Sequence, residues 1–287
     1  MKKSNIIISG ASGFIGTHLY RALADGGYEH VIRMDRGAPE VIQSGDIIVH
    51  LACSTTPVTS ELHKEQDIKD NVVSSLRLLE ICVARKIEKF IFLSSGGTVY
   101  GDHSDALLKE EFACNPRSFH GVMKLTIEHY IQAFHAQHDL PYLIARGGNV
   151  YGRRPDAVKA QGAIDVFLKR TMAGEPIEVQ GDGTTVRDYI YIDDAVDFLR
   201  HAITMPVEGI FNMGTGIGTS LREILDIIQR ITGKTPQVRH TDQKKFDVAS
   251  VVLDIQKAKQ YLAWAPQYSV EDGIRKLHEY YISPSAS

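Results

Sequence analysis

Short apolar runs alternate with longer amphipathic segments along the first half of the chain. Runs rich in β-branched residues predict strands at residues 5–9, 30–35, 46–52, 89–95 and 141–146. Between them, apolar positions recur at helical spacing over residues 14–24, 67–85 and 120–138. The strand runs are almost continuously apolar, which indicates burial on both faces of a parallel sheet. This alternation predicts an α/β fold with a doubly wound parallel sheet.

The pattern changes after about residue 150. Helices are predicted at residues 163–173, 193–204, 220–232 and 270–281, and glycine and proline become denser in the connections. We expect a smaller C-terminal α+β lobe that covers the carboxyl ends of the first sheet's strands, the edge where open α/β sheets bind ligands.

Composition narrows the classes of function. The chain has 287 residues, 43% hydrophobic and 23% charged, which is typical of a soluble globular protein. A net charge of −3 offers no basic field for nucleic acid or an anionic membrane surface. Its three cysteines form no CxxC pair, so neither a metal site nor a disulfide framework is expected. No apolar run approaches the ~20 residues of a membrane helix, and we expect a cytoplasmic protein.

A glycine-rich loop, Gly-Ala-Ser-Gly-Phe-Ile-Gly at residues 10–16, joins the first strand to the first helix. Its glycines permit a tight turn and close approach of the backbone to a pyrophosphate, and the helix N-terminus adds free N–H groups. The spacing GxxGxxG also suits a tight turn without a ligand. Asp35 ends the second strand, where a carboxylate can accept both ribose hydroxyls, although it could be a simple turn residue. The adjacent Arg36 could bind a 2′-phosphate, so NAD is expected and NADP remains possible.

Four further motifs follow this loop in order. They are Asp-Ile-Ile-Val-His-Leu-Ala at 46–52, Ser-Ser-Gly-Gly-Thr-Val-Tyr-Gly at 94–101, Asn-Val-Tyr-Gly at 149–152 and Arg-Asp-Tyr-Ile-Tyr-Ile-Asp-Asp at 187–194. With Trp-Ala-Pro-Gln-Tyr-Ser-Val-Glu-Asp-Gly at 264–273, the chain resembles the extended short-chain dehydrogenases of the NAD-dependent epimerase/dehydratase family, notably UDP-galactose 4-epimerases. The resemblance implies a Rossmann-like NAD(P)-binding domain over residues 1–149. Residues 150–287 would mostly form the nucleotide-sugar-binding lobe, with segments near 188–204 returning to the first domain.

The resemblance also implies which residues bind. Cofactor contacts are expected from Gly10, Ser12, Gly13, Phe14, Ile15, Gly16, Asp35, Arg36, Leu51, Ala52, Cys53, Asn71, Ser94 and Lys124. Contacts to a UDP- or dTDP-sugar are expected from Ser95, Gly96, Thr98, Asn149, Arg187 and Lys245. A planar guanidinium suits a diphosphate, although Arg187 could instead pair with Asp188, Asp193 or Asp194. Lys245 stands in a stretch where many relatives carry a second arginine. A homodimer is expected from the resemblance alone.

The family's Tyr-x-x-x-Lys motif is altered in this chain. His120 occupies the tyrosine position and Lys124 the lysine position. Gly96 stands where relatives place a Ser or Thr that holds the reacting hydroxyl. If this segment stays extended, Thr98 points the same way as Gly96, and Ser95 is a second candidate.

Three interpretations of His120 remain open. It could be a neutral acid/base whose pKa is lowered by Lys124. The chain could instead bind its ligands with slow or absent catalysis, or His120 could be structural while Thr98 or water handles the proton.

Three functions follow from these interpretations. The expected one is a NAD-dependent epimerase that transfers hydride at a hexose carbon through a 4-keto intermediate. The alternatives are an NADPH-dependent 4-ketoreductase and a catalytically impaired sugar-nucleotide-binding protein. Dehydration is disfavoured because Gly97 and Thr98 stand where dehydratases carry an Asp-Glu pair.

Overall fold

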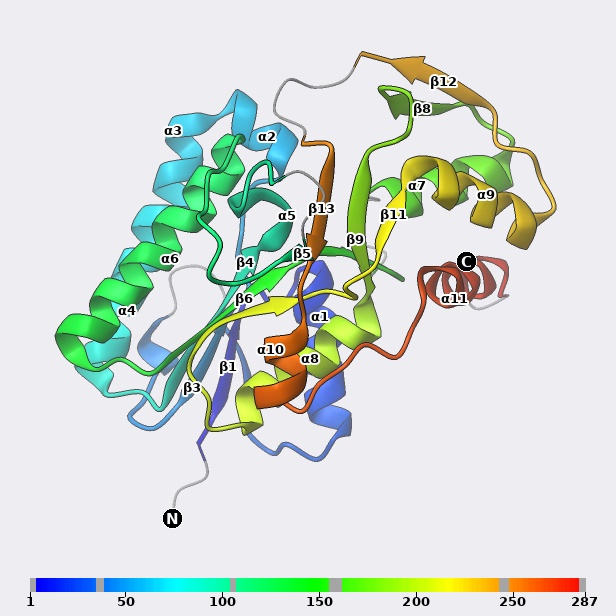
Figure 1. Cartoon of the computed structure of the whole chain (residues 1–287). Coiled ribbons are helices and arrows are strands. Elements are labelled where there is room, and N and C mark those ends of the chain that lie inside the picture. Colours follow the sequence, from blue (N-terminus) through cyan, green and yellow to red (C-terminus); the bar gives the residue numbers. More distant parts are fainter. Residues whose placement is uncertain (1–3, 35–38, 104–106, 155–161, 243–247, 284–287) are drawn as a thin grey trace.

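A six-stranded parallel sheet forms the centre of the computed structural model, which describes residues 4–34, 39–103, 107–154, 162–242 and 248–283 (Figure 1). In sheet order, its strands are β10 (Gly209–Met213), β6 (Tyr142–Gly147), β4 (Lys89–Ser95), β3 (Ile47–His50), β1 (Ile6–Ser9) and β2 (Val31–Met34). Every residue of β1 and β3 is buried, as expected for central parallel strands. The predicted doubly wound parallel sheet is confirmed.

Helices cover both faces of this sheet. Helix α1 (Phe14–Asp25) and helix α8 (Ile192–Thr204) lie on one face, where Leu19 and Leu199 share a core with Ile6 and Ile8. Helix α4 (Ser74–Arg85) and helix α6 (Phe119–His138) cover the opposite face, whose core contains Ile7. The alternation of Ile6, Ile7 and Ile8 between two cores follows from the two-residue period of a strand. Helix α10 (Gln256–Tyr261) packs against β10.

The segment before α4 is more irregular than the predicted helix at residues 67–85. Helix α2 (Pro57–Leu62) is followed by α3 (Lys64–Asp67), by a π-helical stretch at Ile68–Val73 and only then by α4. The helix pattern therefore begins earlier than predicted and contains a wide turn. Such π-turns are common near functional sites because they change the direction of neighbouring side chains. The short connection between β2 and β3 contains only a 3-10 turn at Pro39–Val41 among its described residues.

Smaller sheets complete the C-terminal part. One contains β11 (Gly218–Ser220), β9 (Val186–Tyr191), β13 (Ser250–Leu253) and β5 (Leu107–Leu108), and β7 (Asn149–Tyr151) also pairs with β9. The other pairs β12 (Val238–Thr241) with β8 (Ile177–Gln180). Helices α7 (Ala163–Ala173), α9 (Leu221–Thr232) and α11 (Val270–Ile282) pack with these strands. This arrangement brings β13 beside α5 (Gly96–Val99), the short helix that begins directly after β4.

None of the helices in the described ranges is both long and apolar enough to span a bilayer.

Candidate functional site

The glycine loop is held tightly against the segment that follows β3. Gly10 has a φ of +78°, and a Cβ built there would lie 2.7 Å from the backbone nitrogen of Ala52. A Cβ on Gly16 would overlap the carbonyl oxygen of Gly10, and the amide of Gly13 donates to that same oxygen at 3.0 Å. Gly13 is the N-cap of α1 without any side-chain cap. The loop therefore presents bare backbone and the helix N-terminus to a phosphate group.

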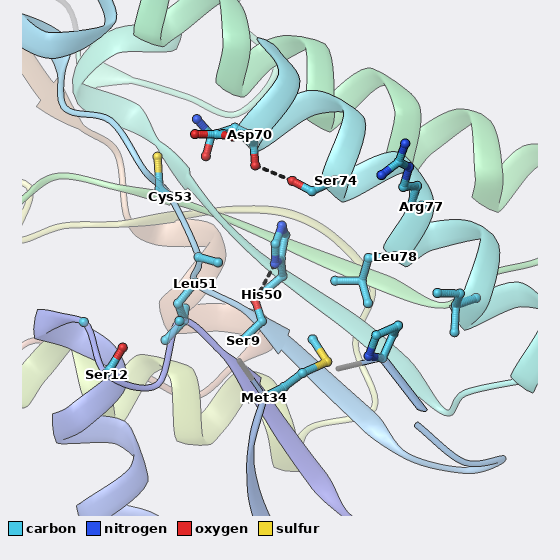
Figure 2. Close-up of a pocket in the computed structure, with 16 residues that line it drawn as sticks. Ser9, Ser12, Met34, His50, Leu51, Cys53, Asp70, Ser74, Arg77 and Leu78 are labelled. Carbon is cyan, nitrogen blue, oxygen red and sulfur yellow. Dashed lines mark hydrogen bonds between the residues drawn. The ribbon is translucent and has the colours of Figure 1, made fainter. Parts of the chain in front are cut away.

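A groove of about 540 Å³ opens beside this loop (Figure 2). The ends of β1 and β3 form its floor, and the π-helix with α4 forms its far wall, where Ser74, Arg77 and Leu78 lie. The groove is lined by the following predicted cofactor contacts: Gly10, Ser12, Gly13, Leu51, Ala52, Cys53 and Asn71. Because no side chain blocks the glycine loop, these residues fit the pyrophosphate and ribose of NAD.

The other predicted cofactor contacts lie elsewhere or are not described. Phe14, Ile15, Gly16, Ser94 and Lys124 do not line this groove. Asp35, Arg36 and the predicted substrate contact Lys245 lie outside the described residues.

His50 forms the polar floor of the groove, a role that sequence reasoning missed. Ser75 donates its hydroxyl to the Asn71 carbonyl at 2.6 Å, so its oxygen must accept the N–H of His50 Nε2 at 2.9 Å. His50 Nδ1 then accepts from Ser9 Oγ at 2.6 Å. Burial, and secondly the charge of Lys124, lower the pKa of His50 to about 3. The ring is therefore neutral with both nitrogens bonded. The signal in the sequence was its position within the buried strand of the motif at 46–52.

Asn71 ties the loop after β3 to the π-helix. Its side-chain oxygen accepts from the Ser54 amide at 3.0 Å, and its nitrogen donates to Asp67 Oδ1 at 2.7 Å. Asp67 also accepts from the hydroxyls of Thr55 and Ser60. These bonds fix the wall of the groove without a ligand.

Residues 96–98 do not stay extended, so the expectation that Thr98 and Gly96 point the same way was wrong. The chain turns directly from β4 into α5. A Cβ on Gly96 would lie 2.8 Å from Leu253 Cδ2 and 3.1 Å from the Arg146 carbonyl oxygen. The space of a Ser or Thr side chain at position 96 is therefore filled by Leu253, whereas Thr98 faces the substrate side.

His120 and Thr98 form what we call the catalytic corner, where α6 meets α5. A Cβ on Gly121 would overlap the carbonyl oxygen of Thr98, so the two helices are in direct contact. Among the described residues, His120 Nδ1 and Thr98 Oγ1 are buried without a hydrogen-bond partner. Burial, and secondly the charge of Lys124, lower the pKa of His120 to about 4, while Asp67 acts in the opposite direction. The imidazole is therefore neutral near pH 7.

Lys124 and the residues below it anchor α6 to β4. Lys124 Nζ donates to the Leu93 carbonyl at 2.9 Å and lies 4.8 Å from the centre of the Phe92 ring. Its charge is thus held at the end of β4, between the groove and the catalytic corner.

One turn further along α6, Glu128 forms a buried ion pair that sequence reasoning also missed. Arg146 Nη2 contacts Glu128 Oε2 at 2.7 Å, and its Nε donates to both carboxylate oxygens. Ser94 donates its hydroxyl to Glu128 as well. Since all three side chains are buried, this network links α6, β4 and β6 beneath the site.

A second cavity of about 170 Å³ adjoins the catalytic corner at Thr98, whereas His120 does not line it. It is lined by Pro57, Gly97, Thr98, Gly101, Arg117, Ser118, Asn149, Arg187 and Val248. The predicted contacts Thr98, Asn149 and Arg187 are thus brought together, whereas Ser95 and Gly96 do not line the cavity. Arg117 was not predicted; its only signal was its position directly before the N-cap of α6.

The three carboxylates considered as alternative partners of Arg187 have other contacts, and Asp193 lies 3.8 Å from Arg153 Nη2. Both oxygens of Asp188 accept backbone amides, among them Thr215 at 2.7 Å and Gly216 at 3.0 Å. Asp194 accepts the amides of Gln267 and Tyr268. Arg187 itself donates from Nη1 to the Val186 carbonyl at 2.8 Å. Within the described ranges, no cluster of His, Cys, Asp and Glu is arranged to hold a metal ion.

Comparison with known proteins agrees with this geometry. Residues 6–214 match the model of the NAD dependent epimerase/dehydratase family. A putative UDP-glucose 4-epimerase from Methanocaldococcus jannaschii is 29% identical over 296 residues, covering 95% of this chain and 96% of that protein. The structure of UDP-glucose 4-epimerase from Thermotoga maritima with UDP-glucose superposes with a TM-score of 0.89 at 32% identity, covering 96% of this chain and 98% of that one. The Thermus thermophilus UDP-glucose 4-epimerase complex with NAD gives 0.88 at 27% identity, with 98% and 99% covered.

The chain belongs to the NAD-dependent epimerase/dehydratase family. The predictions of family, fold and NAD as cofactor are therefore confirmed, as is the prediction of an enzyme. The individual site residues are placed by the structure but remain predictions as to their roles.

Proposed function

We propose that this enzyme is a NAD-dependent 4-epimerase of a nucleotide-linked hexose, with UDP or dTDP as the nucleotide. The observation that carries the proposal is the catalytic corner. Two buried polar atoms without partners, His120 Nδ1 and Thr98 Oγ1, lie on two helices in direct contact. Unpaired buried polar groups are rare in folded proteins, and a sugar hydroxyl would satisfy both.

His120 is the acid/base in this proposal. When bound, NAD supplies the acceptor and the donor of hydride at the sugar carbon. Neutral His120 takes the proton of the C4 hydroxyl, holds it while the sugar is a 4-ketone, and returns it after the sugar has turned over. Thr98 hydrogen-bonds the same oxygen. This order of events leaves the enzyme unchanged after each turnover.

The remaining residues bind and orient. Lys124 holds the nicotinamide ribose, and its charge adds to the effect of burial in keeping His120 neutral. Asn149 and Arg187 hold the diphosphate, with further contacts from Ser95 and Lys245.

We also propose a cytoplasmic homodimer in which α4 and α6 of both subunits pair, since Val122 and Tyr130 on α6 are exposed apolar side chains. Sedimentation equilibrium of the purified protein tests this assembly.

The function is tested with a panel of UDP- and dTDP-hexoses incubated with the purified protein and NAD, with products resolved by NMR. Conversion of a sugar to its C4 epimer without net consumption of cofactor is the expected result. Stoichiometric oxidation of added NADPH by a 4-keto sugar would instead identify a ketoreductase. Binding of the sugar nucleotides with neither reaction would contradict the enzymatic proposal.

A further inference from the structure

Arg117 gives the substrate cavity a second guanidinium on the side of the catalytic helix. It precedes Ser118, the N-cap of α6, whereas Arg187 belongs to β9. None of the described residues that line this cavity is Asp or Glu. The described lining therefore carries two guanidinium groups and no carboxylate, which suits an anionic ligand.

The two arginines meet different parts of the substrate in the proposed binding mode. Arg187 and Asn149 hold the diphosphate. Arg117 instead lies three positions before His120 in the sequence, so the proposed binding mode puts it on the side of the cavity nearer to C4 of the sugar. The C6 substituent of a hexose is attached to C5, next to C4, so it extends toward the same end. A guanidinium there is opposite in charge to a carboxylate and can donate two parallel hydrogen bonds to it.

Resting on the function proposed above, we propose that the substrate is a nucleotide-linked hexuronic acid, whose C6 carboxylate is recognised by Arg117. The residue is then a specificity determinant for the sugar rather than part of the proton transfer.

Asp102 is the group that the sugar carboxylate would replace. Arg117 Nη1 lies 3.6 Å from Asp102 Oδ2, and both side chains are half exposed. Exposed ion pairs of this kind are weak, so they are exchanged easily for a better-placed carboxylate. A neutral C6 hydroxyl cannot compete in the same way, because it leaves the guanidinium paired with Asp102. The pair therefore lowers the net affinity for a sugar carboxylate and leaves the affinity for a neutral sugar unchanged.

Isothermal titration of the NAD-loaded protein with UDP, UDP-glucose and UDP-glucuronic acid tests this assignment. The wild-type protein should bind UDP-glucuronic acid about tenfold or more tightly than UDP-glucose, as expected for one charge-assisted contact. Arg117→Gln should remove that difference while leaving UDP and UDP-glucose within about twofold of wild type. Asp102→Asn should tighten UDP-glucuronic acid alone. Arg200→Gln is the matched control, since Arg200 pairs with Asp197 at 3.7 Å on α8, outside the cavity.

Three results would overturn the assignment. If Arg117→Gln weakens UDP by as much as UDP-glucuronic acid, Arg117 serves the diphosphate. If wild type binds UDP-glucose and UDP-glucuronic acid equally, no carboxylate is recognised, and Asp102→Asn settles this independently should the Arg117 variant fold poorly. If wild type binds none of the three, the proposed function itself fails and the sugar assignment falls with it.

Discussion

The cofactor groove and the catalytic corner differ in whether their buried polar side chains are hydrogen-bonded within the protein. In the groove, His50 is bonded at both ring nitrogens, and Asn71 is bonded at both ends of its amide. In the corner, His120 Nδ1 and Thr98 Oγ1 are buried with no partner. The groove is thus complete without a ligand, whereas the corner is not. In the proposed function, cofactor binding depends on a preformed shape, and chemistry depends on buried atoms that have no partner within the protein.

This difference has an energetic meaning. Leaving a buried polar group unpaired costs about 1–3 kcal/mol, whereas a buried network with all bonds made is rigid and stable. The corner therefore lowers the stability of the free enzyme and regains it when a hydroxyl binds. Substitution of His120 in the corner should therefore change activity more than stability, whereas substitutions in the groove and beneath the corner should lower stability.

The largest effect is expected on activity at the corner. His120→Ala should lower kcat by about 100- to 10,000-fold, the range of general acid–base catalysis, with little loss of stability. His129→Ala is the matched control, since His129 is an exposed histidine on the same helix. Turnover of the best substrate from the panel and unfolding in urea measure both quantities. Equal activity of the two variants would remove His120 from the proton transfer.

The second-largest effect is expected on stability, at the buried ion pair beneath the catalytic corner. Glu128→Gln removes the charge that compensates buried Arg146, and the free energy of unfolding should fall by about 3 kcal/mol. Glu80→Gln, at an exposed position on α4, provides the control and should change it little. Urea denaturation of both variants makes the comparison. A loss no larger than that of the control would show that the ion pair does not hold α6 in place.

A smaller loss of stability is expected in the groove, where backbone fit is tested directly. Gly16→Ala forces a Cβ into the Gly10 carbonyl oxygen, so the loop must shift. Overpacking of this kind typically costs about 1–3 kcal/mol, and affinity for NAD should fall because the helix N-terminus moves with the loop. Fluorescence titration with NADH and urea unfolding test both effects. Unchanged affinity would mean that the loop's shape does not determine cofactor binding.

The smallest effect is expected on the pH dependence of stability. The folded-state pKa of His120 is lowered, so the unfolded chain binds more protons below the ordinary histidine pKa, and stability falls as pH falls. Between pH 7 and about 5.5, wild type should lose about 1 kcal/mol more than His120→Phe, which cannot take up that proton. Chemical unfolding at the two pH values checks the difference. Parallel losses in both proteins would show that His120 is not buried as described.

Much of the fold was predictable because its determinants are local. The apolar runs of β1, β3 and β4 and the glycine loop specify a buried parallel sheet and a phosphate-binding turn from sequence spacing alone. The course of residues 96–98 could not be predicted, because it depends on Leu253, which is remote in sequence and fills the space beside Gly96. The same is true of the π-helix at Ile68–Val73, whose wide turn leaves no mark in a hydrophobic pattern.

The candidate site shows the same limit. Lys124, Asn149 and Arg187 were found because they stand in recognisable motifs. His50, Glu128 and Arg117 were missed because each acquires its role from a partner distant in sequence or from a shared cavity. The sequence alone does not distinguish a buried glutamate such as Glu128 from a solvent-exposed one. Its contact with Arg146 in the folded protein makes the distinction.

The contact between Gly121 and the Thr98 carbonyl has a consequence for how this site can be altered. It sets the spacing of α5 and α6 through backbone atoms alone, so the way the two helices meet does not depend on which side chain stands at position 120. A designer could therefore vary the side chain at position 120 without changing the contact between the two helices.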